Sequence, residues 1–426
     1  MVYLSSNIMT FKLNFVCIIF LVFSMWFSYS YFDLINSYAQ PSSTDPSTND
    51  SVIDIIKFEG MTGTVAVNQK TNIVYLTNVN AGTVSIIDGT TNKIVDVFDV
   101  EKSAFGIGVN QETNMIYVAI EHKNLLYVVN GFTNQIEHKI EMNDPYDIAV
   151  DYNANMIYVT SDRSGLVYAI DGDTNKIVST FEVPNPCGVA VNPETGMVYV
   201  TSESTNMVHV IDGKKNELVT IIDVSESPRG VTVNEKTNTI FVTNQESDSV
   251  SVIDGFTNSV IDSIDVGKDP RRIVVNPESN IIYVTNQGSN DVSVIDATDN
   301  SVIDSIPVNS PFEMAINPDS NKVYVTFYGT DELTIIDWVE PSPQELILPP
   351  KKQIELGISS DEIICKNNFE LIFKSSDNSP ACVKPSTAQK LLERGWTISG
   401  HQLSEEELET KNNPRDIEVM ARGQGN

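Results

Sequence analysis

Basic residues are scarce in this chain. Only 27 Lys and Arg residues stand against 57 Asp and Glu, and the formal net charge is −30. The acidic residues are spread along the chain, so the protein would repel nucleic-acid phosphates and anionic lipid headgroups. The composition therefore argues against a nucleic-acid partner and against binding to a membrane surface. Acidity of this kind indicates solubility or salt tolerance rather than a particular ligand.

Histidine and tryptophan are scarce as well. Of three Trp residues only Trp338 lies near the repeats described below, so the Trp-rich motifs of quinone-dependent redox proteins are missing. No Ser, His and Asp arrangement can be nominated from chain order. We therefore predict no catalytic residue and no cofactor. A metal site is not predicted either, because the four histidines, His122, His138, His209 and His401, lack the spacing of metal ligands.

Residues 1–39 contain a long apolar stretch preceded by a single charged residue, Lys12. This pattern predicts an export signal, and the small-residue sequence SYA predicts cleavage between Ala39 and Gln40. The alternative is an uncleaved anchor, because the apolar stretch Phe15–Phe32 reaches the lower length limit for crossing a bilayer. In both cases the following residues are extracellular or on the cell surface.

Only four cysteines are present. Cys17 belongs to the signal, and Cys187 has no Cys or His nearby. Cys365 and Cys382 remain as a pair, and in an exported protein a disulfide is expected between them. Closing a loop of this length stabilises a fold by roughly 3 kcal/mol.

What the chain has in abundance is an internal repeat. Residues 240–254 read IFVTNQESDSVSVID, and residues 282–296 read IYVTNQGSNDVSVID. A fixed period of about forty residues indicates one supersecondary unit copied end to end. Seven copies follow from the aromatic residue of the motif, which recurs every 41 or 42 positions at Tyr75, Tyr117, Tyr158, Tyr199, Phe241, Tyr283 and Tyr324.

Each copy predicts four short antiparallel strands. Apolar residues alternate or occur in β-branched runs between Asn, Gly, Pro and Asp, which is a strand pattern. In one copy we expect strands at 259–265, 272–276, 281–285 and 292–296, joined by tight turns. Seven four-stranded units predict an all-β, seven-bladed β-propeller, with a linear solenoid as the alternative.

The two ends of the repeat region favour the closed ring. The region opens at 51–58 with SVIDIIKF, which matches the outermost strand of a copy, and closes at 333–337 without one. The N-terminal strand is therefore expected to complete the seventh blade, leaving no open edge. A solenoid would need polar capping repeats, and the terminal copies are as apolar as the others.

The motifs IYVTN, VSVID and VNPESN resemble the YVTN family of β-propeller repeats over roughly residues 51–338. The resemblance implies a cell-surface or exported protein of archaeal type. It leaves the function open, because such propellers are binding modules and, more rarely, enzymes.

Residues shared by all copies are interpreted as structural. The Tyr or Phe marker would pack between blades, and the Asp that ends each VSVID motif would bond the backbone of the following turn. A ligand site is better sought where the copies differ, at two positions that begin each innermost strand. The candidate ligand-binding residues there are Phe105, Tyr146, Asp147, Arg229, Arg271, Arg272, Phe312 and Glu313.

Three of these candidates are arginines from neighbouring copies of an acidic protein. They could receive an anion such as a carboxylate, sugar acid or phosphate. The alternative is that they pair with Asp147, Glu313 or Asp269 and only hold loops in place. The runner-up function is a secreted lactonase-like hydrolase with a channel calcium, for which Asp147, Glu203 and Glu313 are the only ligands we could name.

The flanking segments complete the domain organisation. Residues 40–50 are expected to be a disordered linker, 339–353 a Pro-rich linker and 401–426 a disordered acidic tail. Residues 354–400 predict a small α+β module with strands at IICKN, FELIFKS and PACVKP, and a helix at STAQKLLERG capped by Ser386. This module resembles one that recurs on exported archaeal proteins.

Taken together, the sequence predicts an exported or cell-surface propeller that acts as a monomeric binding scaffold. The expected partner is a protein or glycan of the cell envelope, bound at the variable loop face. An enzymatic role is not expected.

Overall fold

The computed structural model describes residues 51–327 and 329–338, and within the C-terminal module residues 350, 354, 359, 363, 365, 370–374, 379–383, 385–392, 394 and 396–398. The predicted signal and its cleavage site at Ala39 and Gln40, the 40–50 linker and the 401–426 tail lie outside the described residues. Within the described part of the chain, no helix is both long and apolar enough to span a bilayer.

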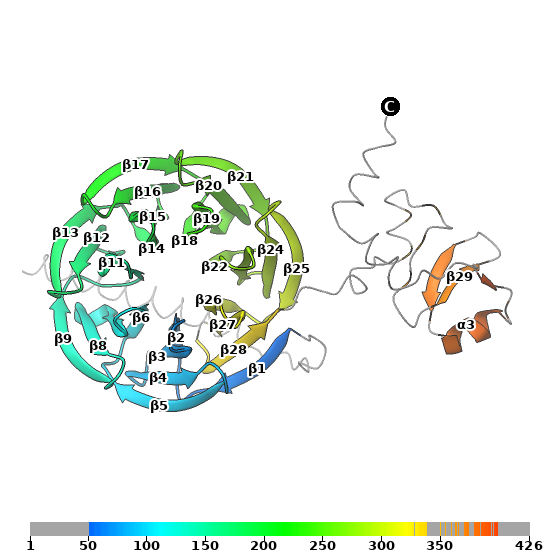
Figure 1. Cartoon of the computed structure of the whole chain (residues 1–426), viewed down its shortest axis with the longest axis horizontal. Helices are drawn as coiled ribbons and strands as arrows, with labels where there is room; N and C mark the ends of the chain where they lie inside the picture. The colour runs from blue at the N-terminus through cyan, green and yellow to red at the C-terminus, as the bar shows by residue number, and fades with distance from the viewer. Residues whose placement is uncertain are drawn as a thin grey trace, which may run out of the picture. The chain divides into compact units, whose positions relative to one another are not determined.

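Seven four-stranded antiparallel sheets are arranged in a ring (Figure 1), which confirms the seven-bladed β-propeller. We number the blades along the chain, from blade 1 (β2–β5) to blade 7 (β26–β28 with β1). From the axis outward the first strands are β2 (Thr62–Asn68), β6 (Ala104–Asn110), β10 (Ile148–Asp151), β14 (Pro186–Asn192), β18 (Pro228–Asn234), β22 (Pro270–Asn276) and β26 (Pro311–Asn317). The second strands are β3 (Ile73–Asn78), β7 (Met115–Ile120), β11 (Met156–Ser161), β15 (Met197–Ser202), β19 (Thr239–Asn244), β23 (Ile281–Asn286) and β27 (Lys322–Phe327).

The outer half of each blade is equally regular. The third strands are β4 (Thr83–Asp88), β8 (Leu125–Asn130), β12 (Leu166–Asp171), β16 (Met207–Asp212), β20 (Ser249–Asp254), β24 (Asp291–Asp296) and β28 (Glu332–Asp337). The outermost strands are β5 (Lys93–Asp99), β9 (Gln135–Glu141), β13 (Lys176–Glu182), β17 (Glu217–Asp223), β21 (Ser259–Asp265), β25 (Ser301–Pro307) and β1 (Val52–Lys57). Two single turns of 3₁₀ helix, η1 (Glu121–Lys123) and η2 (Gln245–Ser247), lie in connecting loops.

The ring closes through β1, as the sequence predicts. This strand pairs antiparallel with β28, with Ile56 opposite Leu333, and so supplies the outermost strand of blade 7. The pairing extends by one backbone hydrogen bond at each end, from Asp337 N to Ser51 O (2.9 Å) and from Phe58 N to Asp331 O (2.7 Å). Blade 7 is therefore built from both ends of the repeat region, which excludes a solenoid.

The hydrophobic core lies between the blades. Seven clusters of buried side chains in the ring each join two neighbouring blades. Tyr75 of blade 1, for example, packs with Ile107, Ile116 and Val118 of blade 2 and is 2% exposed. This burial confirms that the aromatic marker packs between blades. Burying a side chain of this kind stabilises the fold by roughly 1.5–3 kcal/mol.

In five blades the Asp that ends the third strand orders the turn after it, and Asn130 does the same in blade 2. Asp88 Oδ1 accepts hydrogen bonds from the backbone N–H groups of Thr90 (2.8 Å) and Thr91 (2.9 Å). These bonds favour the carboxylate and lower the pKa of Asp88. The turn then ends at Asn92, whose φ of 57° lies in the left-handed region that Asn tolerates well. The interpretation of this Asp as structural is thereby confirmed.

The C-terminal module contains β29 (Glu370–Lys374), β30 (Pro380–Val383), α3 (Pro385–Leu392) and β31 (Trp396–Ile398), with the sheet order β30-β29-β31. Cys365 and Cys382 form a disulfide. Two local expectations are wrong. The third strand is β31, because Ile363 and Cys365 of the IICKN segment lie outside strands, and the helix begins at Pro385, a residue whose fixed φ and missing N–H suit a first helical turn.

Candidate functional site

All eight candidate residues lie at the axial start of the innermost strands. We call them the axial cluster. Phe105 is in β6, Tyr146 and Asp147 directly precede β10, Arg229 is in β18, Arg271 and Arg272 are in β22, and Phe312 and Glu313 are in β26. Their placement follows from the repeat, because equivalent positions of every blade meet around one axis.

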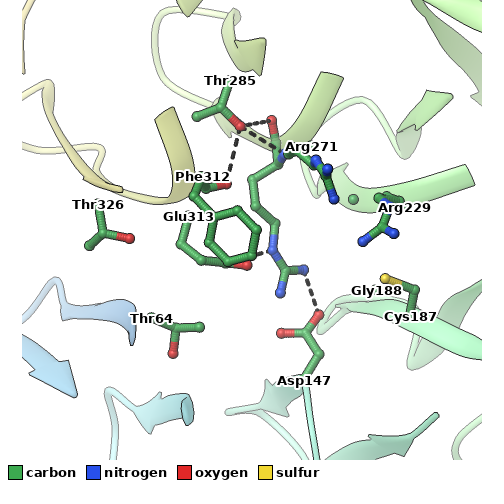
Figure 2. Close-up of polar contacts among 12 residues, drawn as sticks. Thr64, Asp147, Cys187, Gly188, Arg229, Arg271, Thr285, Phe312, Glu313 and Thr326 are labelled. Atoms are coloured by element: carbon green, nitrogen blue, oxygen red, sulfur yellow. Dashed lines mark hydrogen bonds and ion pairs between the residues drawn. The ribbon is translucent and has the colours of Figure 1, made fainter. Parts of the chain in front are cut away.

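Arg272 is the centre of the axial cluster. Its Nε donates to Glu313 Oε2 of the neighbouring blade 7 at 2.6 Å, and its Nη1 lies 2.8 Å from Asp147 Oδ2 of blade 3. Figure 2 labels both carboxylate residues, Asp147 and Glu313, and marks their contacts with dashed lines. Blades 3 and 6 are three apart in a ring of seven, so the Arg272–Asp147 pair crosses the centre of the ring.

Burial sets the electrostatics of this ion-paired group. The Arg272 side chain is 14% exposed and that of Glu313 only 8%. Burial raises the pKa of Glu313 to about 7, although Arg272 pulls it down. Burial also opposes the charge of Arg272, yet the carboxylates of Asp147 and Glu313 outweigh it and hold the pKa of Arg272 well above its ordinary value. Near neutral pH, Arg272 therefore stays charged while Glu313 is part protonated.

The other two arginines are paired as well. Arg229 Nη2 lies 2.8 Å from Glu203 Oε1, and its Nε donates to Gln245 Oε1. Arg271 Nε lies 3.1 Å from Asp269 Oδ1. The sequence-based alternative, pairing with Asp147, Glu313 or Asp269, thus describes two of the three arginines. Glu203 and Gln245 were missed as partners, although both follow second strands at the same face of the ring.

Aromatic rings close the remaining side of the axial cluster. Phe105 stacks on Tyr146 with ring centroids 5.3 Å apart and meets Phe312 edge-on at 6.4 Å. Phe105 and Phe312 come from blades 2 and 7, and blade 1 between them carries Gly63 at the equivalent position. Such aromatic pairs contribute about 0.5–1.5 kcal/mol beyond their burial.

A small pocket lies within this arrangement, lined by Tyr146, Cys187, Arg229, Gly230, Arg271, Arg272, Phe312 and Glu313. Its free volume of about 10 Å³ is roughly what one water molecule needs. A larger group therefore enters only where a lining side chain moves. Cys187 is the lining residue that charge-based reasoning passed over, and burial raises the pKa of its thiol to about 11, so it is not a ready thiolate nucleophile.

The residues named for a channel calcium fit that ion poorly. Asp147 and Glu313 both contact Arg272, and Glu203 contacts Arg229. Each of these carboxylates is thus already paired with the guanidinium group of an arginine. Calcium instead requires six or more oxygen atoms that converge on one point. A second group, Glu121, His122 and Asp144, brings three potential ligand atoms within 4.8 Å, but Arg163 lies 3.7 Å from Glu121 and 3.3 Å from Asp144.

Comparison with known proteins supports the fold alone. No protein-family model and no curated protein matches the chain. Among solved structures, a chain of the "Crystal Structure of Mitotic Checkpoint Complex" is similar with a TM-score of 0.61 at 11% identity, covering 71% of this chain and 97% of that one. At this identity the similarity establishes a shared propeller architecture. The resemblance to YVTN repeats stays a prediction.

Proposed function

We propose that the protein is an exported or cell-surface propeller of the YVTN type that binds a protein or glycan of the cell envelope at the axial cluster. The observation that carries this proposal is the contrast between shared and variable positions. Residues common to all blades pack between them or order turns, whereas the variable positions converge on one small pocket lined by arginine, carboxylate and aromatic side chains. A few convergent polar groups beside aromatic rings are typical of ligand sites.

The same geometry supports binding rather than catalysis. The cysteine in the pocket is buried with a raised pKa. Glu313 has the pKa of about 7 that a general acid or base needs, but its Oε2 already accepts a hydrogen bond from Arg272 Nε. An acid or base near the reacting bond, or an activated nucleophile, is what a hydrolase requires. We therefore propose a non-catalytic role.

The test is a binding screen of the purified protein against cell-envelope polysaccharides and proteins. The informative variant is Arg271→Gln with Asp269→Asn, which removes a pocket cation together with its partner and leaves the net charge unchanged. Asn also suits the positive φ of position 269 (55°). Arg163→Gln with Asp144→Asn is the matched control, because it neutralises an ion pair outside the pocket.

We expect the first variant to lose at least tenfold in affinity for any captured ligand at an unchanged melting temperature, and the control to bind like the unaltered protein. Equal affinity of both variants would reject the axial cluster as the binding site. The export proposal is tested separately, by the N-terminal mass of the protein from its native cells. A chain starting at Gln40 supports cleavage, and an intact Met1 supports the anchor.

A further inference from the structure

A ring of threonine hydroxyls links neighbouring blades near the axial cluster. In six blades, a Thr of the second strand donates its hydroxyl to a backbone oxygen in the next blade, at 2.7–3.3 Å. The six donors are Thr77, Thr160, Thr201, Thr243, Thr285 and Thr326. Blade 2 carries Ala119 at this position, which has no hydroxyl to offer to Tyr146 O of blade 3. The threonine ring is therefore interrupted between blades 2 and 3.

A second ring of links joins the blades at the other ends of the innermost strands. In six blades, the last residue of the innermost strand is an Asn that donates its side-chain amide to a turn Asn of the next blade, at 2.6–2.9 Å. The pairs are Asn68–Asn114, Asn110–Asn155, Asn192–Asn238, Asn234–Asn280, Asn276–Asn321 and Asn317–Asn72. Between blades 3 and 4 both members differ, because Asp151 replaces the donor and Gly196 the acceptor.

Both interruptions flank blade 3. Its junction with blade 2 lacks the threonine link, and its junction with blade 4 lacks the asparagine link. The junction with blade 4 keeps a different link, from Asn153 Nδ2 to Pro193 O at 3.1 Å. The innermost strand β10 spans four residues, and Tyr146 and Asp147 before it continue the pairing with Thr160 of β11. Each missing repeated link lowers the free energy of local opening. Among the described blades, blade 3 is the one that lacks a repeated link on both sides.

The contact that compensates comes from across the ring. Asp147, directly before β10, receives Arg272 of blade 6 at 2.8 Å, and its Oδ2 also accepts the Val189 N–H of blade 4 at 3.1 Å. In the pocket, Arg272 is accompanied by Arg229 and Arg271. A carboxylate is thus already bound where an incoming one would find three guanidinium groups, and it belongs to the blade that lacks a repeated link on both sides.

We propose that Asp147 is an internal stand-in for the carboxylate of the ligand, and that a carboxylate-bearing ligand displaces it from Arg272 and loosens blade 3. This inference rests on the proposed function and names its ligand chemistry. Exchange of one carboxylate for another keeps Arg272 paired, so binding need not leave a buried charge alone. Ligand binding should then increase the fraction of molecules in which blade 3 is locally open.

The test uses D-glucuronate as the probe and D-glucose as its neutral counterpart, with N-acetylglutamate and its neutral diamide, N-acetylglutaminamide, as a second pair. Hydrogen exchange of residues 148–160 is followed in the full-length protein. We expect faster exchange there with either saturating carboxylate, and no change with the neutral compounds. A response to glucuronate alone assigns a sugar acid, and a response to N-acetylglutamate alone assigns an acidic amino-acid group.

Two variants separate the steps. Asp147→Asn removes the internal competitor and is expected to lower the Kd for the carboxylate about tenfold. Ala119→Thr supplies the missing hydroxyl opposite Tyr146 O, at a position where six blades accommodate Thr, and is expected to slow exchange in 148–160 and weaken binding about threefold. If Asp147→Asn does not fold, Ala119→Thr and the unaltered protein decide the question.

Unchanged exchange of blade 3 at saturation, or carboxylate affinity that neither variant alters, would overturn the proposed displacement. If no carboxylate binds while the envelope screen finds another ligand at the axial cluster, the carboxylate assignment fails and the proposed function stands. If nothing binds at the axial cluster, the proposed function itself fails.

Discussion

The guanidinium of Arg272 lies 2.8 Å from the carboxylate of Asp147, a residue 125 positions earlier in the chain and three blades away around the ring. The pair lies in a buried environment and joins blades that share no strand pairing or packed face. The pair contributes to the stability of the ring and is also part of the candidate site. The stability of each variant at these positions must therefore be measured together with its ligand affinity.

Replacing Arg272 by Met should strongly destabilise the protein. The change leaves Asp147 and Glu313 buried without their cation, and breaking a buried ion pair from one side costs about 3–5 kcal/mol. Urea unfolding followed by tryptophan fluorescence measures the loss. Arg163→Met is the control, since Arg163 is 65% exposed and its pairing should contribute less than about 1 kcal/mol. Equal losses in both variants would contradict the central role of Arg272.

Glu313 should make stability depend on pH. Its pKa is about 7 in the folded protein against an ordinary value of 4.5, so the folded state binds the proton more tightly. The resulting stabilisation is full below about pH 4.5 and is lost as the pH rises through 7. The loss amounts to about 3 kcal/mol at 1.36 kcal/mol per pKa unit. Arg272, Asp147 and Arg229 are the charged groups that face this carboxyl.

The measurement is the free energy of unfolding between pH 4.5 and 8 for the unaltered protein and for Glu313→Gln. The variant cannot ionise, so the difference between the two proteins should grow with pH in this window and level off above it. A constant difference would show that Glu313 titrates normally.

A charged residue introduced into β1 should destabilise the protein only where its side chain faces the core. Ile56 of β1 lies opposite Leu333 and is packed against the cluster between blades 7 and 1, so Ile56→Asp should cost about 2–4 kcal/mol. Ile53 in the same strand is 44% exposed, and Ile53→Asp should change stability by less than about 0.5 kcal/mol. Thermal unfolding distinguishes them. Similar melting temperatures would mean that β1 does not contribute to the core.

The aromatic marker should tolerate loss of its hydroxyl. Among the described residues, Tyr199 Oη has no hydrogen-bond partner although it is buried, and the next blade already carries Phe241 at this position. Tyr199→Phe should therefore be neutral or stabilising, because an unsatisfied buried hydroxyl costs about 1–3 kcal/mol. Tyr199→Ala should cost about 3–5 kcal/mol. Destabilisation by the Phe variant would reveal a partner for the hydroxyl.

The sequence was sufficient for the ring because its period, strand pattern and unmatched outer strand are all local features. Equivalent positions of a ring must meet at its axis, so the residues of the axial cluster could be named as well. The partner of Arg272 could only be narrowed to a set that included Asp147, because a contact across the axis depends on side-chain reach and channel width. The module at 354–400 was less predictable, since short apolar runs such as IICKN and WTI are equally compatible with strand and loop.

The two rings of links show a different limit. Ala119, Asp151 and Gly196 stand out in an alignment of the seven copies, but the bonds that they interrupt run between blades. From the sequence alone, these three substitutions cannot be distinguished from substitutions that affect no contact between blades.

The pairing of β1 with β28 also has a consequence for biosynthesis. A ribosome makes β1 first among the strands of the ring and β28 last, so the earliest strand must wait for its partner until the whole repeat region has been made. Such long-range pairing is slow to form. A product of interrupted translation would therefore have an unpaired β1 and an incomplete ring, and its exposed strand edge would promote aggregation.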